Sequence, residues 1–140
     1  LEHQPYEQSN IAWIGSLTQC IRIKKCTTKS TQLESLLQAS ERNSKINRRT
    51  RALLFAATSD YYLIIERSLP KALEYSKKAI KEKHSQVELW LQLARLQILS
   101  NESSKAVKTL DRAKQKDVNK IFQKEISLLM KAARQRIGNR

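Results

Sequence analysis

Residues 72–80 read Ala-Leu-Glu-Tyr-Ser-Lys-Lys-Ala-Ile, and residues 106–114 read Ala-Val-Lys-Thr-Leu-Asp-Arg-Ala-Lys. Both stretches have alanine at their first and eighth positions, and the second stretch lies 34 residues after the first. Residues seven apart lie on one face of an α-helix, where small side chains let a neighbouring helix approach closely. A fixed period of this length indicates an array of helix pairs that bury their apolar faces by stacking on one another.

A wider set of spaced residues surrounds the second stretch, within residues 87–120. Its members are Trp90, Leu93, Ala94, Ala106 and Leu110. This set resembles the tetratricopeptide repeat, whose 34-residue pattern is W-x2-L-G-x2-Y, then A-x3-F, then P. Gln97 and Val118 depart from the Tyr and the Pro of that pattern.

A poorer copy covers residues 53–86, where Ala72 and Ala79 keep the pattern of the second helix. The departures in this copy are Ala56 for Trp, Ser59 and Asp60 for Leu-Gly, and Ser76 for Phe. The resemblance therefore covers about half of the chain and is stronger in the second copy.

The resemblance implies an all-α fold, a short α-solenoid of antiparallel helix pairs. Two repeats would occupy residues 53–86 and 87–120, with extra N-terminal helices in residues 1–52 that pack on the array and a capping helix in residues 121–140. We expect one compact domain. Because the first residue is Leu rather than Met, we expect a fragment or a processed product of a longer chain.

The composition of the 140-residue chain agrees with an all-α class. Only two Gly and two Pro leave few turn signals, whereas good helix formers are abundant. Hydrophobic residues at 40% and charged residues at 29% are typical of a folded domain. No stretch approaches the run of about 18 apolar residues that a membrane span needs. The compartment stays open, with the cytoplasm favoured over a periplasmic or membrane-anchored parent chain.

Apolar periodicity predicts about six helices. In residues 10–24, the spacing of Trp13 and Leu17 favours a helix. The alternation of Ile21 and Ile23 with basic residues leaves a short strand open at the end of this segment. We favour the helix.

Cap and breaker residues divide the middle of the chain. Two capping boxes, Thr31 with Glu34 and Ser85 with Glu88, predict helix starts. The apolar run in residues 52–65 predicts a helix of about four turns that is buried on most sides.

Polar segments at residues 27–30, 43–47 and 101–104 are expected to connect helices. Ser68 and Pro70 predict the start of another helix, because proline is tolerated in a first turn. The last helix is expected directly after Asp117. Its predicted apolar face comprises Val118, Phe122, Ile126, Leu129, Ala133 and Ile137.

Charge is the second feature that needs a physical account. The chain has 27 Lys and Arg against 13 Asp and Glu, for a net charge of +14. Such a chain attracts polyanions, and salt weakens the attraction. The densest cluster, Arg48, Arg49 and Arg51, is either a solvated face or a basic patch. Aromatic residues at 6% give little support to a base-stacking site.

The resemblance also implies where a partner binds, since such arrays line a concave groove with the first helix of each pair. Applying the period gives three rows: Leu54, Glu88 and Phe122; Ala57, Leu91 and Glu125; Tyr61, Arg95 and Leu129. This mixed, mainly apolar groove lacks the Lys, Arg and Asn set with which family members hold a peptide's terminal carboxylate. It would accept a partner helix or an extended segment, unless the chain's own first helices partly fill it.

Residues that carry enzymatic chemistry are sparse. His3 and His84 are the only histidines and are far apart in the sequence, and Gly15 and Gly138 are the only glycines. A metal site or a glycine-rich phosphate loop is therefore not indicated. We expect no metal, no cofactor, no small-molecule substrate and no catalysis.

Cys20 and Cys26 are the only cysteines. A continuous helix cannot bring them into disulfide geometry, but a turn beginning near Lys24 could. Two ordinary thiols and a disulfide both remain open. A disulfide would indicate an oxidising compartment.

We therefore expect a protein-interaction module of tetratricopeptide type, which is a scaffold or adaptor. Its partner would be a protein or peptide, and the net positive charge of the chain would favour an acidic one. The alternative is a basic helical domain that docks on nucleic acid or on an anionic membrane surface. A third possibility is an accessory domain of an enzyme whose active site lies elsewhere in the parent chain.

Overall fold

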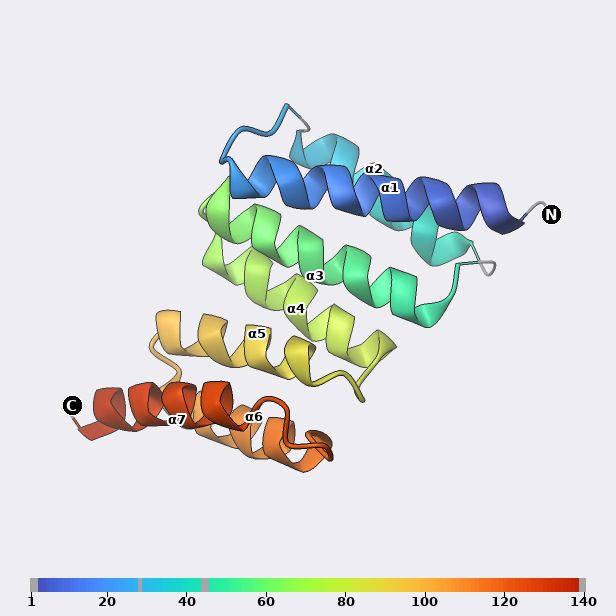
Figure 1. The fold of residues 1–140 in the computed structure, drawn as a ribbon. Coiled ribbons are helices and arrows are strands. Elements are labelled where there is room, and N and C mark those ends of the chain that lie inside the picture. Colours follow the sequence, from blue (N-terminus) through green and yellow to red (C-terminus); the bar gives the residue numbers. More distant parts are fainter. Residues whose placement is uncertain (1–2, 28, 44–45, 139–140) are drawn as a thin grey trace. The chain divides into compact units, whose positions relative to one another are not determined.

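The computed structural model describes residues 3–27, 29–43 and 46–138, with side chains from residue 13 onward. These residues form seven α-helices and no strand (Figure 1): α1 (His3–Arg22), α2 (Ser30–Arg42), α3 (Arg48–Ile64), α4 (Leu69–Glu82), α5 (Val87–Leu99), α6 (Ser103–Lys116) and α7 (Gln123–Gly138). The expected all-α class is confirmed. Within the described ranges, no helix is both long enough and apolar enough to cross a membrane.

Parts of three sequence expectations lie outside this description. Thr28 belongs to the polar segment 27–30, and residues 44–45 belong to the expected connection 43–47. The side chain of His3 is also outside it.

The helices fall into two compact units. The first unit, Leu1–Lys83, contains α1 to α4, and the second unit, His84–Arg140, contains α5 to α7. In the first unit α3 packs on α4, α1 and α2, and in the second unit α6 packs on α5 and α7. The most extensively packed pair of consecutive helices is α3 with α4 in the first unit and α5 with α6 in the second unit. The domain boundaries expected from the sequence stay a prediction.

The second helices of the two pairs follow the predicted period. α4 and α6 both have 14 residues, and they begin at Leu69 and at Ser103, a separation of 34. The turns before them are also equivalent, since Arg67 (φ 52°) and Asn101 (φ 62°) both adopt the left-handed conformation. That conformation turns the chain sharply at the end of the preceding helix. The helix pairs therefore repeat in backbone conformation as well as in sequence.

The alanines of the two quoted stretches have no exposed surface: Ala72, Ala79, Ala106 and Ala113 are each 0% exposed. The first two lie on α4, which packs beside α3, and the other two lie on α6, which packs beside α5 (Figure 1). A methyl group at these positions allows close approach of the helix axes, whereas a larger side chain would separate them. The helix-pair architecture expected from the alanines is confirmed.

The capping box expected at Thr31 and Glu34 is wrong. α2 begins one residue before Thr31, and the backbone N–H of Lys29 donates to Gln32 Oε1 at 3.1 Å. Glu34 is engaged elsewhere, because its Oε1 accepts a hydrogen bond of 2.8 Å from the hydroxyl of Tyr62 on α3. A tertiary contact therefore uses the carboxylate that the sequence assigned to the cap.

The start of α5 also differs from the expectation, whereas the start of α4 does not. The cap residue of α5 is Gln86, which makes no side-chain cap, so the predicted box of Ser85 and Glu88 is wrong. α4 begins directly after Ser68, with Pro70 in its first turn as predicted. Proline stabilises that start because the first turn needs no N–H from it.

α1 extends through Arg22, so the short strand left open around Ile21 and Ile23 does not form. Leu17 and Ile21 are buried with 3% and 7% of their surface exposed. Their spacing of one helical turn places both on the same side of α1, and α1 packs on α3 within the first unit. The helix predicted for residues 10–24 is thus confirmed, with an earlier start and with its end at Arg22.

The turn after α1 brings the two cysteines together. Lys24 has φ 58°, and the backbone N–H of Lys25 donates to the carbonyl oxygen of Cys20 at 3.0 Å. Cys26 then lies beside Cys20, with 4.9 Å between the Cα atoms, and the two form a disulfide. Of the two possibilities that the sequence left open, the structure contains the disulfide.

α7 begins later than predicted. The carboxylate of Asp117 accepts hydrogen bonds from the backbone N–H groups of Ile121 and Phe122, at 3.0 and 2.9 Å, and this holds the segment before Gln123 in a turn. Val118 is consequently outside the helix and 82% exposed.

Only the middle of the predicted apolar face of α7 is buried. Ile126 and Ala133 are 4% and 0% exposed, whereas Ile137 near the end of the helix is 40% exposed. The face therefore covers the core of the second unit along its centre.

Candidate functional site

The predicted rows contribute three residues to α3 of the first unit. Leu54, Ala57 and Tyr61 are buried, with at most 8% of their surface exposed. The hydroxyl of Tyr61 donates to Glu66 Oε1 at 3.1 Å, and its ring lies edge-on to the ring of Tyr62 with 5.5 Å between centroids. These side chains are not accessible in this conformation. Their participation in a partner site stays a prediction.

In the second unit the apolar row members belong to a core or cover it. Leu91 on α5 lies in a buried cluster whose other members are Val87, Ala94, Leu110, Ala113 and Ile126. Phe122 and Leu129 pack against this cluster and are partly buried. Each leaves part of its side chain at the surface of the second unit.

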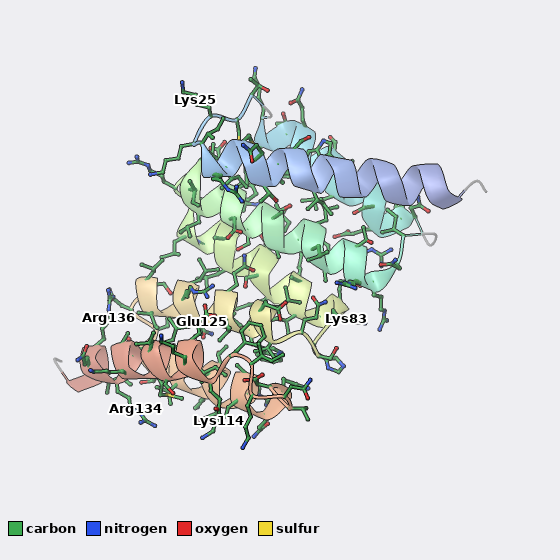
Figure 2. The ribbon with its side chains drawn as sticks, viewed as in Figure 1. Lys25, Lys83, Lys114, Glu125, Arg134 and Arg136 are labelled. Carbon is green, nitrogen blue, oxygen red and sulfur yellow. A yellow bond between two sulfur atoms is a disulfide. The ribbon has the colours of Figure 1, made fainter. Side chains whose placement is uncertain are left out.

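The charged row members lie at the surface of the second unit. Arg95 on α5 and Glu125 on α7 form an ion pair, with side chains 48% and 40% exposed. Glu88 is exposed two turns before Arg95 on the same helix. Figure 2 shows Glu125 on the side of α7 that faces α5. The structure therefore brings two residues from different rows, Arg95 and Glu125, into contact.

Two further residues were missed by the sequence analysis. Leu99 is 52% exposed and follows Arg95 by one helical turn, and this spacing could have identified it. Arg136 on α7 donates from Nη1 to the carbonyl oxygen of Ile98 at 2.9 Å and lies 3.4 Å from Asn101 Oδ1. No sequence signal marks that contact, because its main acceptor is a backbone carbonyl. The row members of the second unit that reach its surface, together with Leu99, form one candidate binding surface, which we call the α5–α7 face. Its residues are Glu88, Arg95, Leu99, Phe122, Glu125 and Leu129.

The arginine cluster is divided by the structure. Arg48 and Arg49 are exposed in the first turn of α3. Arg51 has a side chain only 15% exposed, and its guanidinium donates to the carbonyl oxygen of Asn43 at 3.0 Å and lies 3.5 Å from Glu82 Oε2. Arg51 therefore links the end of α2 to α4. The role of the three arginines as a basic patch stays a prediction.

Trp90, at the most characteristic position of the repeat pattern, fixes the entry into α5. Its indole N–H donates to the carbonyl oxygen of His84 at 2.7 Å. Its ring packs against the buried cluster of the second unit. In the parts of the chain that the structure describes, no group of three or more His, Cys, Asp and Glu residues is placed to hold a metal ion.

Comparison with protein families finds a match to the tetratricopeptide repeat over residues 63–131. The chain carries tetratricopeptide repeats. The matched tetratricopeptide region contains α4, α5 and α6 completely, and it leaves out most of α3, where the poorer copy departs from the pattern. No match was found among curated proteins or among solved structures. Tetratricopeptide repeats are protein-interaction modules and are typically not catalytic.

Proposed function

We propose that this tetratricopeptide chain is a scaffold or adaptor module whose α5–α7 face binds a helix or an extended segment of a partner protein. The observation that carries the proposal is the repetition of packed helix pairs at the family's period, together with the family match over residues 63–131. Such repeats offer rigid helical surfaces rather than reactive groups. The module acts without catalysis, cofactor or small-molecule substrate.

The chemistry of the α5–α7 face suits a mixed partner segment. The ion pair of Arg95 and Glu125 is about half exposed, so exchanging it for charges of a partner costs little, since exposed pairs contribute only about 0–1 kcal/mol. Leu99 and Leu129 provide apolar surface next to these charges. Alternating charged and apolar contacts of this kind fix the register of a bound helix or strand.

The net charge of +14 favours an acidic partner. Long-range attraction raises the association rate of oppositely charged proteins and falls as salt is added. The partner segment is therefore expected to carry Asp and Glu around its apolar anchors.

A peptide selection tests the α5–α7 face. Peptides selected from a random display library on the immobilised chain are titrated by fluorescence anisotropy against wild type, Arg95→Glu and Leu99→Ser. We expect each change to weaken binding about tenfold. Lys108→Glu on α6 is the control, because Lys108 is exposed and lies outside the face. Peptides whose affinity is the same for all four chains would overturn this assignment.

The charge also supports a second candidate function, docking on nucleic acid or an anionic membrane. Arg48 and Arg49 are adjacent, exposed cations and are the candidate contact for such a polyanion. Titrating duplex RNA and phosphatidylserine vesicles from low to physiological salt tests it, with Arg48→Glu/Arg49→Glu as the variant. Binding that collapses over this salt range and weakens in the variant supports polyanion docking. Binding that the variant leaves unchanged speaks against that patch.

A further inference from the structure

α6 and α7 border an open groove with a volume of about 1050 Å³. All the residues that line it belong to the second unit. Figure 2 shows Lys114 on α6 and Arg134 on α7 extending from one side of this unit, opposite to the side on which Glu125 and Arg136 lie. The groove is therefore distinct from the α5–α7 face.

The groove has an apolar floor and basic walls. Ile126, 4% exposed, and Met130, partly buried, form the floor where α7 covers the core. The cations that line the walls are Lys114, Lys124, Lys131 and Arg134, all exposed. Asp111 is the one acidic residue among the lining residues that the structure describes.

These four cations have no carboxylate partner in the described part of the chain. Ion pairs elsewhere in the second unit join Arg95 to Glu125 and Lys105 to Glu102. The lining thus has four cations and one carboxylate, Asp111, around an apolar strip, and the excess charge is positive. A ligand that fits must offer negative charge on both sides of an apolar stripe.

We propose that the groove between α6 and α7 binds an acidic amphipathic helix of a partner protein. Apolar residues of the bound helix cover Ile126 and Met130, and carboxylates on its flanks approach Lys114 on one side and Lys131 and Arg134 on the other. The apolar side of such a helix matches the apolar floor, and its charge is opposite to that of the walls.

The shape of the groove favours a helix over an extended segment. Lining residues recur along α7 from Gln123 to Gln135, about 18 Å of helix at 1.5 Å per residue. A helix of about 12 residues lies along such a furrow by packing its ridge of side chains between two helices. An extended segment points successive side chains to opposite sides, so only every second residue would reach the apolar floor.

The same observations disfavour two other occupants. No aromatic side chain lines the groove among the described residues, and its floor is apolar, so stacked bases would gain little there. A second copy of the chain carries a net charge of +14 and would be repelled.

A designed peptide tests the proposal. The probe is a helix-favouring peptide of about 14 residues with leucines at i, i+3, i+4 and i+7 and glutamates beside them. Its control has the same composition with the leucines distributed around the helix. A third probe is poly(U) RNA. Binding is measured by fluorescence anisotropy at physiological salt, and the site is located from the amide chemical shifts of the labelled chain.

Two double variants with equal change in net charge locate the binding energy. Lys124→Glu/Lys131→Glu reverses two cations of the groove, whereas Lys108→Glu/Arg112→Glu reverses two exposed cations on α6 outside it. We expect the groove variant to bind the patterned peptide about tenfold more weakly and the control variant to bind it within about twofold of wild type. The amides of Ser127, Met130 and Lys131 should shift.

Several outcomes overturn the proposal. Equal binding of the two peptides would indicate charge attraction alone, and equal losses in the two variants would indicate the same. Shifts confined to the α5–α7 face would place the peptide there. Tighter binding of poly(U) at the groove would assign it to polyanions. If the groove variant does not fold, two measurements on the wild-type chain still test the proposal. These are the affinities of the patterned and control peptides and the amide chemical shifts on adding the patterned peptide.

Discussion

Gln97 on α5 and Thr109 on α6 are joined by a buried hydrogen bond, in which the hydroxyl of Thr109 donates to Gln97 Oε1 at 2.6 Å. The two residues are 5% and 6% exposed. Gln97 stands where the repeat pattern has a tyrosine. In this copy a polar link therefore holds the two helices of the repeat together at a position where the pattern has an aromatic ring.

Thr109→Val should lower the free energy of unfolding by about 1–3 kcal/mol, because the buried oxygen of Gln97 loses its donor while the shape of the side chain is kept. Urea denaturation followed by circular dichroism measures this. The double variant Gln97→Leu/Thr109→Val should recover most of the loss, since replacing both partners by apolar groups leaves nothing unsatisfied. A single variant as stable as wild type would show that this link contributes nothing.

The helix pairs could be predicted from the sequence because their signal is local. Ala106 and Ala113 share a helix face whatever surrounds them, and the same holds for Ala72 and Ala79. The left-handed turn at Arg67 could not be predicted, because this position carries neither the glycine nor the asparagine that usually marks such a turn.

Helix starts and the accessibility of the site depend on contacts between elements. Glu34 fits a capping box in sequence, but Tyr62 on α3 takes its carboxylate. Tyr61 and Arg95 occupy equivalent positions in the two copies, yet Tyr61 is 1% exposed and the side chain of Arg95 is 48% exposed. The period predicts which helix face a residue belongs to. Whether a partner can reach it depends on the length and polarity of that side chain and on its neighbours.

Arg51→Ala should lower the free energy of unfolding by about 1–3 kcal/mol. The change removes one of the donors to the Asn43 carbonyl oxygen, since the N–H of Ile46 is another, and it leaves Glu82 without its cation. The link between the end of α2 and α4 is then lost. Arg48→Ala is the matched control and should stay within about 0.5 kcal/mol of wild type, because Arg48 is exposed. Equal effects of the two variants in thermal or urea denaturation would contradict the structural role of Arg51.

Cys20→Ser/Cys26→Ser should destabilise the chain by about 2 kcal/mol, the loop-closure contribution expected for a short disulfide loop. The chain refolded in a glutathione redox buffer should show no free thiol when it is unfolded and treated with a thiol reagent. Wild type under reducing conditions should match the double serine variant in urea. Two titratable thiols after oxidative refolding would exclude the disulfide.

Three tyrosines of the first unit favour the neutral phenol in the folded state. Burial, and next the hydrogen bond to Glu66, raise the pKa of Tyr61 from 10.0 to about 12. Burial and then the nearby carboxylates, Glu34 first, raise the pKa of Tyr75 to about 12. Burial, followed by the 2.8 Å hydrogen bond to Glu34, also raises the pKa of Tyr62 above its usual value.

The chain should therefore lose stability as the pH rises above 10. Tyrosines of the unfolded chain ionise near pH 10, before those of the folded chain, so the unfolded state binds fewer protons and the free energy of unfolding falls until the folded tyrosines ionise as well. The stabilisation that is linked to the raised pKa values of the tyrosines is fully present below pH 10. Urea denaturation across this range measures the fall, and tyrosinate absorbance of the native chain locates the raised pKa. Tyr62→Phe should show a shallower fall than wild type, because it removes one of the three phenols whose pKa is raised in the folded state. Identical slopes would contradict the role of Tyr62.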